Sequence, residues 1–333
     1  MVGINAYATA LPSLRLPASA YVEAWGSCGA RGMEQKAFCA YDEDAVTLAI
    51  SAARAVFEVY SSDVLVDALF LGVTTPPYDE KPSAATIPTA LFNYSGIRVT
   101  EITGSPQAGV QALVSALEFC AANKGRYALA IAADAPEAPV DASYEHALGA
   151  AAAAFLVGPN GPAAEFLETY AVTRETFGAR FRRRGEKVLS DLELRTQDNF
   201  ESLRMLAETS KLPKIKHIAV GADAALMRSA SRALGQPDAI FDGIWSQIGD
   251  AGAASAPFAL AAALDVARSG DTILTIGVGA GATAARFTAG RELAKTRRRG
   301  VKTAHRMAMG RTVNYVTYLK HRRMLSSRNG AAG

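Results

Sequence analysis

The sequence predicts an α/β fold built from two similar halves that follow one another along the chain. Short apolar stretches with strand character alternate with stretches of helical periodicity up to about residue 290. The order of elements then repeats, and each half closes on consecutive apolar strands, at 127–133 with 147–157 and at 272–277 with 283–287. This repeat indicates a duplicated α/β unit with two central sheets.

The first half is predicted to span residues 1–160. Its expected strands cover 2–8, 68–73, 99–103, 127–133 and 147–157. Asp42 can cap a helix whose apolar stripe runs from Val46 to Phe57, and further helices are expected at 82–92 and 108–122. The alanine-rich stretch 147–157 is predicted to be a strand because Gly-Pro-Asn-Gly follows it at once.

The second half is predicted to span residues 161–290. Its expected strands cover 164–172, 216–221, 239–241, 272–277 and 283–287, and its expected helices cover 198–208, 224–234 and 252–267. The polar, arginine-rich segment 173–196 is predicted to be a surface insertion between the halves.

Composition and cysteine usage favour a cytoplasmic protein. The 333 residues are 50% apolar and 20% charged, without a run of 18 apolar residues that would predict a membrane span. The N-terminus shows no basic leader before an apolar stretch, so no signal peptide is expected. Three cysteines without metal-type spacing are typical of a reduced cytoplasm, and no metal site is predicted.

Residues 291–333 form a basic C-terminal tail that we expect to be a docking segment. From Ala289 onward there are twelve Lys and Arg against one Glu, whereas the preceding 288 residues carry 23 against 31 acidic residues. The tail also contains spaced aromatic and aliphatic residues, which favours docking on a protein over binding of nucleic acid. The candidate docking residues are Tyr315, Tyr318, Lys320, Arg322 and Arg323.

Motifs along nearly the whole chain resemble those of the archaeal-type 3-hydroxy-3-methylglutaryl-CoA (HMG-CoA) synthases of the thiolase superfamily. They lie at 3–7 (GINAY), 42–48 (DEDAVTL), 71–78 (LGVTTPPY), 128–134 (ALAIAAD), 248–255 (IGDAGAAS), 277–281 (GVGAG) and 313–323 (VNYVTYLKHRR). Their order and spacing carry the resemblance, which is weakest between residues 173 and 196. The resemblance implies the thiolase fold, a five-layered αβαβα sandwich made of two similar halves.

The resemblance also implies a chemistry whose key residues do not occur in this sequence. Members of the family use a cysteine at the start of a helix, a histidine and a glutamate. The matching positions are Pro106 for the cysteine, Val220 for the histidine and Thr74 for the glutamate, and Asp250 matches an Asn-type position. Pro106 has neither a nucleophilic side chain nor a backbone N–H, although it suits a first helical turn. No catalytic residue is therefore predicted.

Two neighbouring residues are weak candidates for a replacement nucleophile. Ser105 precedes the cysteine position, but it has no histidine at a matching position, and a helix N-cap is the simpler interpretation. Cys120 comes near the end of the same predicted helix, where a packed thiol is expected. Asp250 is expected to cap the helix 252–267, and the glycines of 277–281 are expected to make a tight connection between two strands.

The favoured hypothesis is a non-catalytic subunit of an acyltransferase complex. The chain resembles the HMG-CoA-synthase-like subunit of bacterial 2,4-diacetylphloroglucinol acetyltransferase, which also lacks the cysteine. This implies a thiolase subunit and an OB-fold zinc-ribbon protein as partners, with coenzyme A thioesters as substrates of the complex and no cofactor bound by this chain. A thiolase-type interface would make either a homodimer or a heterodimer. The alternatives are an active condensing enzyme with a relocated nucleophile, Ser105 or a cysteine, and an acyl-CoA-binding module.

Overall fold

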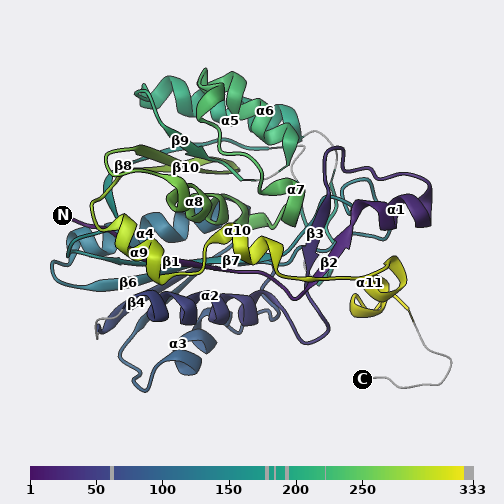
Figure 1. Cartoon of the computed structure of the whole chain (residues 1–333), viewed down its shortest axis with the longest axis horizontal. Coiled ribbons are helices and arrows are strands. Elements are labelled where there is room, and N and C mark those ends of the chain that lie inside the picture. The colour runs from purple at the N-terminus through teal and green to yellow at the C-terminus, as the bar shows by residue number, and fades with distance from the viewer. Residues whose placement is uncertain (61–63, 177–179, 184, 192–194, 222, 326–333) are drawn as a thin grey trace.

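The computed structural model describes residues 1–60, 64–176, 180–183, 185–191, 195–221 and 223–325. These residues form a sandwich of five layers, in the order helices, sheet, helices, sheet, helices (Figure 1). The predicted αβαβα thiolase fold is therefore confirmed. Within the described residues, no helix is long and apolar enough to cross a membrane.

The first outer layer and the first sheet come from the N-terminal part of the chain. Helices α2 (Ala45–Val59) and α3 (Thr86–Leu91) cover the sheet from outside. The strands, in spatial order, are β5 (Arg98–Ile102), β4 (Val66–Gly72), β6 (Tyr127–Asp134), β7 (Ala151–Gly158) and β1 (Gly3–Ala10).

The remaining layers use later segments and one helix of the first half. Helices α4 (Ala108–Ala122) and α8 (Ser255–Val266) form the middle layer. The second sheet contains β8 (Ala164–Thr173), β11 (Gly281–Ala289), β10 (Thr272–Gly279) and β9 (His217–Ala219), in this spatial order. Helices α5 (Arg195–Ser210) and α6 (Ala224–Leu234) form the second outer layer.

The two sheets are joined along one edge. Strands β1 and β8 pair antiparallel through Gly3 with Glu165 and Ile4 with Ala164, so the described strands form one ladder of nine. The prediction of two separate sheets thus needs this correction: the layers are distinct, but a two-residue ladder connects them. The predicted half boundary at residue 160 falls between β7 and β8 and stays a prediction.

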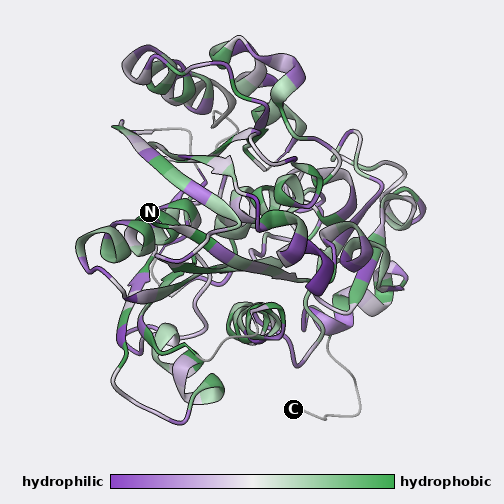
Figure 2. Cartoon of the chain, turned by 60° about the vertical axis from the view of Figure 1, so that its left-hand side comes forward, coloured by the Kyte–Doolittle hydropathy of each residue, from purple (hydrophilic) through white to green (hydrophobic). Residues whose placement is uncertain are grey.

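Small residues make the close layer spacing possible. Strand β7 contains four consecutive alanines, is buried along its whole length, and pairs with β1 on one side and β6 on the other. Burial on both faces outweighs the high helix propensity of alanine. At Gly109 of α4, an added Cβ would lie 1.9 Å from the carbonyl oxygen of Ala253, so this position admits only glycine. Figure 2 shows hydrophobic residues along most of the central strands.

Several predicted elements differ from the structure at their ends, and three of them have a clear physical reason. Helix α2 is capped by Asp44, whose carboxylate accepts from the N–H of Thr47, so the prediction of Asp42 as the cap is wrong. Strand β7 begins at Ala151, because the residues before it pair with the chain around Asp250. The segment predicted as a strand at 239–241 ends a 3₁₀ turn, Pro237–Ala239, and only Ile240 bridges to Ile218.

A peripheral unit lies beside the sandwich and receives the C-terminal tail. Its strands are β12 (Arg311–Thr312), β2 (Leu14–Pro17) and β3 (Gln35–Phe38), and its helices are α1 (Ala18–Trp25), α7 (Trp245–Ile248) and α11 (Tyr315–His321). Two further helices, α9 (Leu293–Arg299) and α10 (Thr303–Ala308), cross the side of the sandwich on the way to α11 (Figure 1).

Candidate functional site

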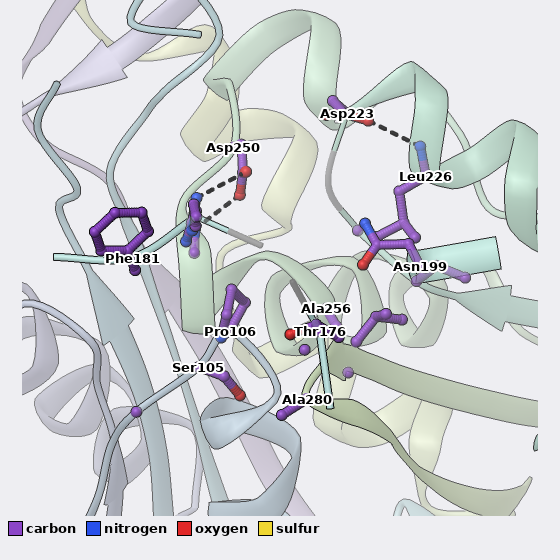
Figure 3. Close-up of a pocket in the computed structure, with 18 residues that line it drawn as sticks. Ser105, Pro106, Thr176, Phe181, Asn199, Asp223, Leu226, Asp250, Ala256 and Ala280 are labelled. Atoms are coloured by element: carbon purple, nitrogen blue, oxygen red, sulfur yellow. Dashed lines mark hydrogen bonds and ion pairs between the residues drawn. The ribbon is translucent and has the colours of Figure 1, made fainter. Parts of the chain in front are cut away.

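A cavity of about 360 Å³ opens where the N-terminal end of α4 meets the ends of β9 and β10. Pro106, Val220 and Asp250 all line it, and so does Ser105. Figure 3 labels Ser105, Pro106 and Asp250 in this lining. Segments far apart in sequence therefore bring three of the four predicted family positions to one wall. Thr74 is not among the lining residues and lies behind the wall, next to Asp134.

The turn before α4 presents Ser105 and Pro106 to the cavity. Gln107 is the residue that precedes the helix, so the prediction of Ser105 as the N-cap is wrong. The Ser105 side chain instead packs against β10, where a Cβ added at Gly279 would lie 2.4 Å from its Oγ. The tight connection predicted for the glycines 277–281 is confirmed, since Gly279 and Gly281 pair across the β10–β11 hairpin.

Among the side chains that the structure describes, none lies beside Ser105 as a base that would activate it. All four histidines belong to the described residues and lie outside the cavity lining. The carboxylates in the lining have structural roles: Asp223 accepts from the N–H of Leu226 at the start of α6, and Asp250 accepts from the N–H of Gly252. A serine hydroxyl needs an adjacent base to become a nucleophile, which this geometry does not supply.

Asp250 connects the start of α8 to Arg180, which belongs to the segment 173–196 and lines the cavity. Its Oδ1 accepts from the N–H of Gly252 at 2.9 Å and from the hydroxyl of Ser255 at 3.1 Å. The N-cap residues of the 3₁₀ turn Gly252–Ala254 and of α8 are Ala251 and Ala254, so the prediction of Asp250 as the helix cap is wrong, although its carboxylate holds the turn that leads into α8. Its Oδ2 lies 3.0 Å from Nη1 of Arg180, and both side chains are more than nine-tenths buried. The ion pair therefore closes one wall of the cavity.

Thr74 belongs to a second buried network, centred on Asp134 at the end of β6. The Thr74 hydroxyl donates to Asp134 Oδ2 at 2.5 Å, the Thr75 hydroxyl donates to Oδ1, and the N–H of Ala253 donates to Oδ2 at 2.9 Å. Asp134 is completely buried. The Thr74 hydroxyl is thus used to satisfy a buried carboxylate.

Val220 is a core residue at the end of β9. It is 1% exposed and packs in the hydrophobic cluster between the second sheet and α5 and α6. Next to it, Gly221 has φ +45°, and a Cβ there would lie 2.1 Å from the carbonyl oxygen of Ser255. The main chain therefore passes the start of α8 too closely for a larger residue, and Val220 offers the cavity only apolar surface.

The described residues of the segment 173–196 are mostly exposed or half-buried, as predicted for a surface insertion, but part of the segment also reaches the cavity. Residues 177–179, 184 and 192–194 lie outside the described residues. Thr176, Arg180 and Phe181 line the cavity, and Nη2 of Arg182 donates to the carbonyl oxygen of Thr74 at 2.9 Å. A Cβ at Gly252 would lie 2.3 Å from Asp134 Oδ2 and 2.8 Å from Arg180 Nη2, so the two networks pack together at this glycine. Sequence reasoning missed Arg180 and Asp134; an aspartate that ends a buried strand was the available indication of the second.

Cys120 lies far from the cavity along α4. Fourteen residues separate it from Pro106, or about 20 Å along a helix. It is 2% exposed, its Sγ lies 3.5 Å from the carbonyl oxygen of Val157, and burial raises the pKa of the thiol to about 12. The interpretation of a packed thiol is confirmed.

Three of the five predicted docking residues of the tail make buried contacts within the chain. Tyr318 is 2% exposed and donates its hydroxyl hydrogen to Glu145, and Tyr315 packs edge-on against Tyr21. Arg322 also points inward, with Nη2 donating to the carbonyl oxygen of Ala138. The prediction that these three side chains form an exposed docking surface is therefore wrong.

Lys320 and Arg323 remain exposed on this part of the tail. Arg323 stacks its guanidinium over the ring of Tyr41. A docking role for these two residues stays a prediction.

The layered fold is the thiolase-like fold, and comparisons with known proteins show which proteins share it. No family model matches the chain. The HMG-CoA synthase of Archaeoglobus fulgidus is 28% identical over 98% of this chain and all of that protein. That of Pyrococcus horikoshii is 27% identical over 97% of this chain and 96% of that protein.

Solved structures give the same result for the fold. MvaS, solved in complex with 3-hydroxy-3-methylglutaryl coenzyme A, matches all of this chain and 94% of its own with a TM-score of 0.86 at 20% identity. PksG, an HMG-CoA synthase from Bacillus subtilis, matches 97% of this chain and 89% of its own with a TM-score of 0.78 at 17% identity. The chain is HMG-CoA-synthase-like in sequence and fold.

Proposed function

We propose that this chain is a non-catalytic, HMG-CoA-synthase-like subunit of a cytoplasmic acyl-CoA acyltransferase complex. Its role would be structural or regulatory, beside a thiolase that supplies the nucleophile and an OB-fold zinc-ribbon protein. The observation that carries the proposal is Pro106, which lines the cavity at the N-terminal end of α4. This is the position that the resemblance assigns to the catalytic cysteine.

A proline at this position removes two contributions to thioester chemistry. Its side chain has no nucleophile, and its nitrogen has no hydrogen to donate to a developing oxyanion. Loss of a nucleophile alone normally lowers the rate by several powers of ten. Val220 contributes no acid or base, and the hydroxyl of Thr74 donates to Asp134. These observations support a subunit that does not turn over substrate by itself.

The cavity itself supports a retained affinity for coenzyme A thioesters. Its volume of about 360 Å³ remains although Pro106 and Val220 line it, and it combines apolar walls with a few polar side chains. An acyl-CoA-binding module without chemistry is therefore the second candidate. It predicts stoichiometric binding of acetyl-CoA by the isolated chain, measurable by calorimetry, with no turnover.

The third candidate is a condensing enzyme with a relocated nucleophile. Ser105 favours it, because it is the hydroxyl side chain next to Pro106 in the cavity lining. Cys120 is a poor alternative, since its thiol is buried and far along α4.

Intact mass spectrometry after incubation with acetyl-CoA or acetoacetyl-CoA tests the proposal. The chain is measured alone and with a thiolase, with Ser105→Ala as the matched control. We expect no added acyl mass on this chain and acylation of the thiolase. Stable acylation of the wild-type chain that is lost in Ser105→Ala would overturn the proposal in favour of an active enzyme.

A further inference from the structure

The segment that contains α9 and α10 carries a dense run of cations with a large local excess of positive charge. Residues 291–311 contain eight Lys and Arg against one Glu, although the whole chain has a net charge of only +3. Arg291, Lys295, Arg298, Lys302 and Arg311 are exposed. We refer to residues 291–311 as the cationic ridge.

The ridge is fixed to the sandwich, so its cations are presented on a rigid surface. Leu293 is 1% exposed in the main core, and the N–H of Thr303 donates to Asp265 Oδ2 at 2.6 Å. Arg297 turns inward and donates to the carbonyl oxygen of Ala267. A rigid surface loses little conformational entropy when a partner binds.

The ridge lies away from the mouth of the cavity. Helix α8 begins at the cavity, where Ala256 lines the wall, and Asp265 near its other end holds Thr303. Nine residues of helix correspond to about 14 Å. The cations of the ridge are therefore not needed to explain how a ligand enters the cavity.

We propose that the cationic ridge is the docking surface for a protein that presents an acidic face. The inference rests on the proposed function for its expectation that a partner subunit exists, but it places the contact on a different surface from the residues first predicted in α11. Charge complementarity would steer the encounter, since residues 291–311 contain eight Lys and Arg against Glu292, which pairs with Lys295.

Exposed apolar side chains between the cations favour a protein over nucleic acid as the partner that binds the ridge. Val301 and Met309 are 48% and 57% exposed and stand within the ridge. Methionine and arginine are enriched at the centres of protein interfaces, where apolar contact supplements charge. The segment 291–311 contains no Phe, Tyr or Trp, the large aromatic side chains that most often stack on bases.

Binding of defined probes to the full chain tests the ridge. The probes are a 20-residue helical peptide of Glu and Leu, a single-stranded DNA of equal charge, and phosphatidylserine vesicles. Arg298→Glu/Lys302→Glu reverses two ridge charges, and Arg228→Glu/Arg232→Glu reverses two exposed charges on α6 as the matched control. Val301→Ser/Met309→Ser tests the apolar contribution, and circular dichroism checks that each variant folds.

We expect the acidic peptide to bind more tightly than the DNA or the vesicles. The ridge charge reversal should weaken peptide binding about tenfold and the serine variant about threefold, while the α6 control changes it less than twofold. Tighter binding of DNA or vesicles, or equal effects of ridge and control, would overturn the inference.

A second arm separates this inference from the proposed function. The wild-type chain and the ridge variant are mixed with the thiolase and examined by size-exclusion chromatography. A complex that survives the ridge reversal contradicts the docking surface and leaves the proposed function intact. If the wild-type chain forms no complex, the proposed function fails, and the peptide measurements still decide whether the ridge binds acidic protein.

Discussion

Lys36 and Glu145 form a buried ion pair, with Lys36 Nζ 2.9 Å from Glu145 Oε1 and each side chain 1% exposed. The pair joins β3 to the segment before β7, and the hydroxyl groups of Tyr21 and Tyr318 both donate to the same carboxylate oxygen. Tyr318 belongs to α11, so this cluster attaches the C-terminal tail to the N-terminal part of the chain. Burial lowers the pKa of Lys36 to about 8, and at neutral pH the pair is charged.

Glu145→Gln should strongly destabilise the protein, because it leaves the Lys36 ammonium buried without a counter-charge. We expect the free energy of unfolding in urea to fall by about 3 kcal/mol. Arg126→Gln is the control, since it removes an ion pair with Asp67 in which the arginine is 63% exposed, and should cost less than about 1 kcal/mol. Equal losses in the two variants would show that Lys36 and Glu145 are not coupled as described.

The contribution of Glu145 to the free energy of unfolding should depend on pH in the acidic range. Burial raises its pKa, but Lys36 and the hydrogen bonds from Tyr318, Lys36 and Tyr21 outweigh burial and hold the pKa below 4.5. The unfolded chain therefore binds more protons in this window, so the stabilisation is complete above about pH 4.5 and is lost as the pH falls through the folded pKa. Urea unfolding from pH 3 to 7 should show the gap between wild type and Glu145→Gln narrowing at low pH; a constant gap would argue against it.

Gly279→Ala should disturb the cavity wall, because the added Cβ would lie 2.4 Å from Ser105 Oγ. We expect a loss of about 1–3 kcal/mol in the free energy of unfolding. Gly96→Ala is the matched control, since a Cβ there meets nothing within 4 Å. Adding Ser105→Gly to Gly279→Ala should restore most of the loss, and a double variant no more stable than the single one would place the clash elsewhere.

Asp250→Ala should destabilise the start of α8, since it removes the acceptor for Gly252 and Ser255 and leaves Arg180 buried without its partner. The expected loss is about 3 kcal/mol, measured by urea unfolding. Glu292→Ala removes the exposed pair with Lys295 and should change stability by less than about 0.5 kcal/mol. A neutral result for Asp250→Ala would mean that the ion pair with Arg180 adds nothing to the fold.

The three cysteines should differ in their reactivity toward iodoacetamide at pH 8. Cys28 is partly exposed and should be labelled first, whereas burial holds the pKa of Cys39 well above its usual value and that of Cys120 at about 12. Peptide mapping over time should show Cys120 labelled only after denaturation. Early labelling of Cys120 in the folded protein would contradict its packing between α4 and β7.

The fold could be predicted because local patterns carry it. Helices at 108–122 and 224–234 were predicted with the bounds that the structure has, since their apolar periodicity and flanking residues are local properties. The strands around 68–73 and 127–133 were found from short apolar runs for the same reason. The cap of α2 was misplaced by two residues because both Asp42 and Asp44 are good capping residues, and only the chain path selects Asp44.

The sequence by itself therefore determined the order of elements and the layered fold class. It also determined which residues occupy the family's catalytic positions, namely Pro106, Val220 and Thr74. Only the tertiary structure decided how they are used: Arg180 reaches Asp250 across 70 residues, Arg182 reaches Thr74 across 108, and Tyr318 reaches Glu145 across 173. Such contacts depend on where distant segments meet in the core, and a buried polar group takes whichever partner the packing brings within hydrogen-bond distance. Local periodicity contains no information about that choice.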